Sequence, residues 1–217
     1  MRGLYLITND DPIELLLEKL EAALATHQIE ILQYRRKKVE KADQLHEVER
    51  IKALCDFYKV PLVINDDIRL AAQCGLGVHL GQTDGEIIEA KTQLPENMII
   101  GRTCANSIEL AEQAIADGAT YIAFGAIYAT YSKPEAGNIG LETLKLARQK
   151  FSLPICAIGG LKVENAQPVI QAGADLCAVI SDILALPAEE IPSRVQAWLF
   201  YLQRPSLLYK LNILILL

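Results

Sequence analysis

The chain has 217 residues, of which 51% are hydrophobic and 22% charged, so it can bury one sizeable core in one or two domains. Its formal net charge of -6 at pH 7 argues against nonspecific binding to nucleic acid, because phosphate backbones attract an excess of Lys and Arg. An anionic small-molecule substrate would need cationic side chains gathered locally.

Short apolar runs rich in β-branched residues recur along the chain and indicate strands. We expect eight of them, at residues 4–8, 29–34, 62–64, 77–80, 99–101, 121–124, 155–158 and 176–180. The stretches between them carry apolar residues at helical spacing and predict helices at 13–25, 41–58, 67–73, 84–92, 107–117, 141–149, 163–171 and 188–202. This alternation predicts a single-domain α/β fold, a (β/α)8 TIM barrel over residues 1–204. An open doubly wound sheet is the alternative, although no GxGxxG follows the first strand.

Residues 205–217 form an apolar C-terminal tail that is shorter than the roughly 20 residues needed to span a bilayer. A packing arm, a contact in a homo-oligomer and an accidental extension of the reading frame all stay open for it. We expect no membrane partner. The five cysteines are scattered and include no CxxC pair, so we expect no disulfide framework and no zinc site. Together with the lack of a secretory signal, this favours a cytoplasmic location.

In such barrels the active site lies at the carboxyl ends of the strands. After the second predicted strand, alternation places Gln33, Arg35 and Lys37 on one side. Arg can bridge phosphate oxygens through two parallel hydrogen bonds, and Lys adds a point charge, so this run suits a diphosphate. A solvated basic loop is the alternative reading.

Carboxylates follow the next two predicted strands. Asn65, Asp66 and Asp67 come after the third strand, and Asp84 comes after the fourth. Mg²⁺ typically takes one or two protein carboxylates and completes its shell with water and phosphate oxygens, so Asp66 and Asp84 are its candidate ligands. Helix N-capping is the alternative role and is compatible with metal binding for Asp67 and Asp84.

His79 lies within the fourth predicted strand, between two apolar residues. A general base is one reading of this residue. We favour a histidine that is hydrogen-bonded inside the barrel.

A long polar segment follows the sixth predicted strand and contains Thr130, Ser132 and Lys133. Its glycines and hydroxyls are typical of a mobile lid, with an ordinary surface loop as the alternative. Loops after the seventh and eighth strands frequently build phosphate sites, and here they carry Gly159 with Gly160, and Ser181.

Six motifs in order resemble those of the thiamine phosphate synthase family, at residues 4–8, 33–37, 65–67, 77–84, 130–134 and 157–160. Each is weak alone, but six in order at similar spacings are specific, and the likeness extends to about residue 200. The resemblance implies the (β/α)8 fold and a phosphorylated pyrimidine and a thiazole phosphate as small-molecule partners. It also implies Mg²⁺ as the cofactor.

The resemblance further implies a role for each site residue. The diphosphate of hydroxymethylpyrimidine diphosphate would be bound by Gln33, Arg35, Lys37, Asn65 and Lys133, with Arg35, Lys37 and Lys133 as the catalytic cations. Asp66 and Asp84 would hold Mg²⁺, and Thr103 would contact the pyrimidine. The thiazole phosphate would be bound by Thr130, Ser132, Gly160, Ile180 and Ser181. Tyr34, Arg36 and Tyr131 belong to the same motifs and complete the expected substrate-binding set.

The family chemistry is dissociative: diphosphate leaves, a pyrimidine methylene cation forms, and the thiazole nitrogen traps it. No protein nucleophile is needed, which agrees with the lack of a convincing His or Cys dyad. Three residues depart from the family pattern. Thr103 and Ser132 keep the expected hydroxyl, while Arg102 adds a charge that should point away from the lumen if its neighbours face inward.

Two other functions compete with the synthase. A thiazole tautomerase of the same fold resembles this chain, but tends to lose the diphosphate and metal residues that are present here. A non-catalytic phosphate-binding barrel would bind thiazole phosphate without turnover and without need of Mg²⁺.

Overall fold

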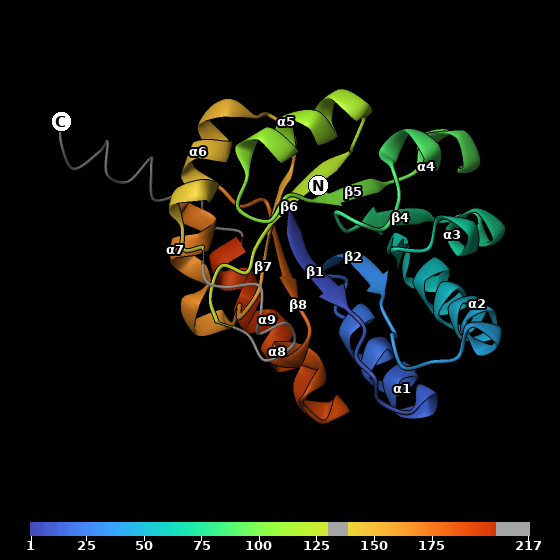
Figure 1. Ribbon diagram of the computed structural model, residues 1–217. Helices are drawn as coiled ribbons and strands as arrows, with labels where there is room; N and C mark the ends of the chain where they lie inside the picture. The colour runs from blue at the N-terminus through green and yellow to red at the C-terminus, as the bar shows by residue number, and fades with distance from the viewer. Residues whose placement is uncertain (130–138, 203–217) are drawn as a thin grey trace.

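The computed structural model describes residues 1–129 and 139–202 and shows eight parallel strands closed into a barrel (Figure 1). The strands are β1 (Gly3–Ile7), β2 (Ile29–Tyr34), β3 (Leu62–Asn65), β4 (Gly77–Leu80), β5 (Ile100–Thr103), β6 (Tyr121–Phe124), β7 (Ile155–Ile158) and β8 (Leu176–Val179). Each strand pairs with the next, and β8 closes the ring on β1 with Leu4 opposite Cys177. The predicted (β/α)8 barrel is confirmed, and the open doubly wound alternative is wrong.

Helices follow the strands and surround the barrel (Figure 1). They are α1 (Ile13–Leu24), α2 (Lys41–Tyr58), α3 (Ile68–Cys74), α4 (Ile87–Gln93), α5 (Ile108–Asp117), α6 (Glu142–Lys150), α7 (Ala166–Gln171), α8 (Ser181–Leu184) and α9 (Ile191–Leu202). The short 3₁₀ turns η2 (Val163–Asn165) and η3 (Ala188–Glu190) precede α7 and α9. Helix α8 was not among the predicted helices, because four residues are too few to show a 3.6-residue period.

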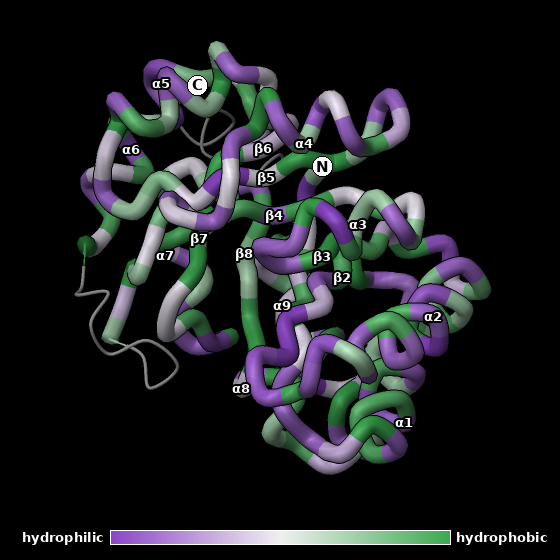
Figure 2. Tube along the Cα trace, turned by 45° about the vertical axis from the view of Figure 1, so that its right-hand side comes forward, coloured by the Kyte–Doolittle hydropathy of each residue, from purple (hydrophilic) through white to green (hydrophobic). Residues whose placement is uncertain are grey.

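The barrel has two apolar layers because successive strand residues point to opposite faces. The inner layer is small and consists of Tyr5, Ile7, Ile31, Val63, Tyr121, Ala123, Cys156, Leu176 and Ala178. The outer and larger layer lies between the strands and the helices, and includes the fully buried Trp198 of α9. Figure 2 shows the apolar strands at the centre and helices of mixed polarity around them.

Local features of the sequence fix several helix ends. The Asp67 and Ser107 side chains accept hydrogen bonds from backbone N–H groups of α3 and α5 and cap these helices. Gly118 ends α5 in the left-handed region at φ 101°. One strand differs in a way that affects the site: β5 continues to Thr103, two residues beyond the predicted end.

The cysteines and the helices bear on two further expectations, a chain without a disulfide framework and one without a membrane partner. All five cysteines are free thiols within the described ranges, and burial raises the pKa of Cys55 to about 12. Across residues 1–129 and 139–202, none of the helices combines the length and the apolar content needed to cross a membrane.

Candidate active site

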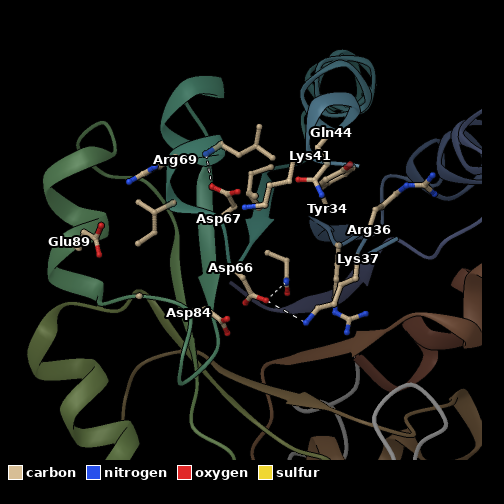
Figure 3. A pocket seen from close by; sticks show the side chains of 16 residues that line it. Tyr34, Arg36, Lys37, Lys41, Gln44, Asp66, Asp67, Arg69, Asp84 and Glu89 are labelled. Carbon is tan, nitrogen blue, oxygen red and sulfur yellow. Dashed lines mark hydrogen bonds and ion pairs between the residues drawn. The ribbon is translucent and has the colours of Figure 1, made fainter. Parts of the chain in front are cut away.

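A pocket of about 470 Å³ opens at the carboxyl ends of β2, β3 and β4, where these strands lead into α2, α3 and α4 (Figure 3). Its lining combines cations and carboxylates: Tyr34, Arg35, Arg36, Lys37, Lys41, Gln44, Ile64, Asn65, Asp66, Asp67, Ile68, Arg69, Leu70, Asp84, Gly85 and Glu89. The pocket therefore collects most of the residues that the sequence analysis assigned to the diphosphate and the metal.

At the end of β2, the alternate residues Gln33, Arg35 and Lys37 have different surroundings. Gln33 is buried and points into the barrel, where its Nε2 donates to the Tyr5 hydroxyl at 2.7 Å. The backbone N–H of Arg35 donates to Thr8 Oγ1, and this hydroxyl donates in turn to the Arg35 carbonyl. Lys37 Nζ lies 3.7 Å from Asp66 Oδ2. Arg35 thus has a fixed backbone, and Lys37 stands beside a candidate metal ligand.

Tyr34 and Arg36 have other partners, although they also line the pocket. The Tyr34 hydroxyl donates to Glu47 Oε2 of α2 at 2.9 Å, and Arg36 donates from Nε and Nη2 to both oxygens of the same carboxylate. Arg36 Nη1 also donates to the carbonyls of Asn9 and Asp11. Burial, helped by Glu47, raises the pKa of Tyr34. These contacts tie β2 to α2, so they give both residues a packing role, and substrate contact by them stays a prediction.

Asp66 is held in an unusual backbone conformation at the end of β3. Its φ of 64° lies in the left-handed region, which is uncommon for a residue other than glycine. Its backbone N–H donates to the His79 carbonyl at 2.8 Å, while its carboxylate accepts from Asn65 Nδ2 and from the Gly81 N–H. The neighbouring strand ends thus determine where this carboxylate lies.

Asp84 lies opposite Asp66, and the two carboxylates influence each other. Burial and the nearby Asp66 carboxylate raise the pKa of Asp84 above its usual value. A side chain at Gly81 would collide with the Asp84 carboxylate in its present position, so glycine leaves room for this close approach. The helix-capping role considered for Asp84 is not seen, because the residue at the N-terminal boundary of α4 is Glu86.

The number and type of the possible ligands indicate which metal ion this pair of carboxylates could bind. Within the described residues, no group of three or more His, Cys, Asp or Glu side chains could hold a metal by itself. Mg²⁺ commonly binds through one or two carboxylates and completes its shell with water and phosphate oxygens. Asp66 with Asp84 fits that pattern, and a zinc cage does not.

Arg102 holds the loop that carries Asp84. Its Nη1 donates to the Gly85 carbonyl at 2.6 Å, and its Nη2 lies 3.9 Å from Glu86. Its neighbours face the lumen: a Cβ on Gly101 would collide with the Tyr121 ring, and Thr103 is hydrogen-bonded inside the barrel. Arg102 therefore points away from the lumen, as the sequence analysis expected.

A chain of hydrogen bonds crosses the barrel beneath the pocket. Gln33 Nε2 bonds to the Tyr5 hydroxyl, which bonds to the Tyr121 hydroxyl at 2.7 Å. The Tyr121 hydroxyl bonds to His79 Nδ1 at 2.6 Å, and His79 Nε2 bonds to Thr103 Oγ1 at 2.8 Å. Burial lowers the pKa of His79 to about 4, so the imidazole is neutral at pH 7. His79 is thus a hydrogen-bonded barrel histidine, which the sequence analysis preferred to a general base.

The ends of β6 and β7 pack against each other closely. Ile127 N–H donates to the Ile158 carbonyl at 2.9 Å, and Gly159 and Gly160 both have positive φ values, 100° and 63°. A Cβ on Gly160 would lie 2.5 Å from the Ala129 carbonyl oxygen, so only glycine fits. This places Gly160 directly beside the last residue before position 130.

The remaining predicted site residues fall into two groups. Ile180 and Ser181 lie where β8 passes into α8. Thr130, Tyr131, Ser132 and Lys133 lie outside the described residues, as does the tail at 205–217.

The comparisons with known proteins identify the family of the chain. Residues 4–183 match the family model for thiamine monophosphate synthase. Thiamine phosphate pyrophosphorylase from Pyrococcus furiosus is similar to the chain at 28% sequence identity and a TM-score of 0.81, over 93% of this chain and 95% of that one.

Two solved structures at lower identity show the fold alone. A thiamine phosphate pyrophosphorylase from Bacteroides thetaiotaomicron is 18% identical with a TM-score of 0.61, over 90% of this chain and 95% of that one. A 3-hexulose-6-phosphate synthase is 17% identical with a TM-score of 0.65, over 88% of this chain and 99% of that one.

Proposed function

Because this chain belongs to the thiamine monophosphate synthase family, we propose that it is a transferase that joins hydroxymethylpyrimidine diphosphate to a thiazole phosphate and releases thiamine phosphate and diphosphate. The observation that carries the proposal is the convergence of Arg35, Lys37 and the Asp66 and Asp84 carboxylates on one pocket. A diphosphate with a hard cation needs this combination of charges.

The proposed reaction replaces one bond to the pyrimidine methylene carbon by another. The C–O bond to diphosphate breaks, and its electron pair leaves with the diphosphate. The thiazole nitrogen then gives its lone pair to form the new C–N bond. Because the barrier is charge separation, side chains that stabilise negative charge on the leaving group lower it.

The cations of the pocket suit that task. Arg35 can form paired hydrogen bonds to diphosphate oxygens, and Lys37 adds a point charge. Asn65 lines the same pocket and can donate through its amide. Lys133 is assigned to the same leaving group by the resemblance. No step needs a protein nucleophile or a general base.

We further propose that Asp66 and Asp84 hold Mg²⁺, for which their donor set is suited. When bound, Mg²⁺ would neutralise part of the charge on the diphosphate. Lys37 Nζ lies 3.7 Å from Asp66 Oδ2, so its charge offsets part of the negative charge of the two carboxylates. Thr103, at the end of the buried hydrogen-bond chain, is placed in the proposal against the pyrimidine.

The thiazole phosphate is assigned to the opposite side of the barrel mouth. Gly160, after β7, and Ile180 with Ser181, after β8, would bind it, together with Thr130 and Ser132. The two substrates would then meet over the lumen, between the ends of β2 to β5 and those of β6 to β8.

The test is product formation from the two substrates by the purified chain, with Mg²⁺ and with chelator, followed by chromatography for thiamine phosphate and diphosphate. The proposal expects both products, in equal amounts and only with the metal. Product that is unchanged in chelator would contradict the metal assignment. Absence of product while thiazole phosphate still binds would favour the tautomerase or the non-catalytic barrel.

A further inference from the structure

Arg194 of α9 bridges two carboxylates that come from different loops. Its Nη1 and Nη2 donate to the two oxygens of Glu164 at 2.7 and 2.9 Å. Its Nε and Nη2 donate to the two oxygens of Asp182. Trp198, one turn further along α9, donates from Nε1 to Asp182 Oδ2 at 2.7 Å. The side chain of Arg194 is 23% exposed and that of Asp182 only 3%.

The two carboxylates flank the proposed thiazole phosphate subsite. Asp182 directly follows Ser181 after β8, and Glu164 stands four residues after Gly160 in the β7–α7 connection. The helices that carry these contacts are packed together: α9 contacts η2, α7 and α8 beside β7 and β8 (Figure 1). Arg194 thus joins the two connections that would form the subsite to one helix.

The contact with Glu164 reaches Gly160 through the next residue. Asn165 Nδ2 donates to the Gly160 carbonyl at 2.9 Å, and its Oδ1 accepts from the Lys162 N–H at 2.8 Å. The turn from Gly160 to Asn165 is therefore closed by its own side chain, and Arg194 fixes it to α9 through Glu164.

Arg194 has little capacity left to bind a phosphate itself. Four hydrogen bonds to carboxylates occupy most of its five N–H donors. The surrounding hollow of about 920 Å³ is also acidic, since Lys162 and Arg194 face Glu164, Asp182, Glu189 and Glu190 there. Hydrogen bonding to Arg194 lowers the pKa of Glu164 to about 2, so both partners are charged near neutral pH.

We propose that Arg194 is a positioning residue for the thiazole phosphate: it clamps the β7–α7 and β8–α8 connections in one arrangement and offsets part of the negative charge of the two carboxylates beside the proposed phosphate site. The inference rests on the proposed function and adds to it a residue outside the motifs. Only a guanidinium can do both, because its planar fork meets two carboxylates at once, whereas a lysine amine reaches them as a point charge.

The test measures KM for each substrate separately in the wild type, Arg194→Met and Arg194→Lys. We expect KM for thiazole phosphate to rise about tenfold in both variants, the loss expected for displaced charge-assisted contacts, while KM for the pyrimidine diphosphate stays within about twofold. Glu164→Gln removes one arm of the clamp at an exposed position, and so tests the same point without threatening the fold.

Arg148→Met is the matched control, because Arg148 forms a similar half-buried ion pair with Asp175 just before β8, at the other end of the barrel. Its two KM values should match those of the wild type. A wild-type KM for thiazole phosphate in Arg194→Lys would contradict the proposed positioning role. Equal rises in both KM values would show that Arg194 contributes only to the stability of the fold. A wild type that forms no thiamine phosphate would instead overturn the proposed function.

Discussion

Asp66 and Asp84 can each lose their charge by an exchange that keeps side-chain size. Asn is one of the few residues that tolerates the left-handed conformation of Asp66, so Asp66→Asn should keep the fold. We expect Asp66→Asn and Asp84→Asn each to lower kcat by about a hundredfold or more at fixed Mg²⁺, since the amide is a poor ligand for a hard cation. Steady-state kinetics with titrated Mg²⁺ measures the effect.

The adjacent Asp67 supplies the control for this pair. It caps α3 through its side chain, and Asn is as good a cap as Asp, so Asp67→Asn should keep both stability and kcat. In chelator, Asp84→Asn should unfold at the same temperature as the wild type or a higher one, because its repulsion with Asp66 is removed. Unchanged kcat in both site variants would exclude these carboxylates as metal ligands.

At the scale of elements, the ion pair of Arg36 with Glu47 fastens the end of β2 to α2. Removing one partner of a buried pair leaves the other charge uncompensated, so Arg36→Met should lower the free energy of unfolding by about 3 kcal/mol. KM for the pyrimidine diphosphate should rise too, because Arg35 and Lys37 flank the loosened residue. Urea unfolding and steady-state kinetics test both parts.

Arg50 offers a comparison on a neighbouring surface of the same helix. It forms an equally well-aligned pair with Glu14, but that pair is exposed to solvent. Surface ion pairs contribute little, so Arg50→Met should leave both the unfolding curve and KM nearly unchanged. A similar loss of stability in the two variants would show that burial is not what makes the Arg36 contact important.

The helices and strands could be predicted because apolar runs typical of strands alternate regularly with stretches of helical periodicity. The eight strands fall within one or two residues of their predicted ends. Strand alternation placed Gln33 on one side with Arg35 and Lys37, and the structure shows that Gln33 points into the barrel. What could not be predicted are contacts between distant elements: the partner of Arg36 is one of several glutamates within or beside 41–58, and nothing in the sequence distinguishes Glu47 from the others.

The site was predictable where its residues follow strands directly and less so elsewhere. Asp66 and Asp84 meet because β3 and β4 are neighbours, which the order of the motifs already implies. Arg194 could not be found in this way, because it lies in α9, far from the strand ends in the sequence, and acts through residues of two earlier connections. Tyr5 and Tyr121 were missed because tyrosines in apolar strands resemble core residues.

For the molecule as a whole, His79 couples stability to pH. Its pKa of about 4 in the folded barrel lies below the usual 6.5, so between these values the unfolded chain binds a proton that the folded one does not. This stabilisation is present above pH 6.5 and is lost as the pH falls toward 4. We expect a loss of roughly 3 kcal/mol over that range from this residue, at about 1.4 kcal/mol per pKa unit.

His79→Gln is the variant that isolates this effect. It should have a lower free energy of unfolding at pH 7, because the bonds to Tyr121 and Thr103 are disturbed, but a smaller dependence on pH between 6.5 and 4. Urea unfolding at a series of pH values measures the slope. An identical slope in the wild type and the variant would assign the pH dependence to other groups.

The hydrogen-bond chain through the barrel also has a direction. The Gln33 amide donates to the Tyr5 hydroxyl, which leaves the Tyr5 proton available for Tyr121, and we therefore expect Tyr121 to donate to His79 Nδ1. A neutral imidazole that accepts at Nδ1 carries its proton on Nε2, and this proton goes to Thr103 Oγ1. Thr103 therefore has its own hydroxyl proton left to offer to a ligand. Nitrogen NMR of the His79 ring should show the Nε2–H tautomer. The Nδ1–H tautomer would mean that the donors and acceptors of this hydrogen-bond chain are reversed.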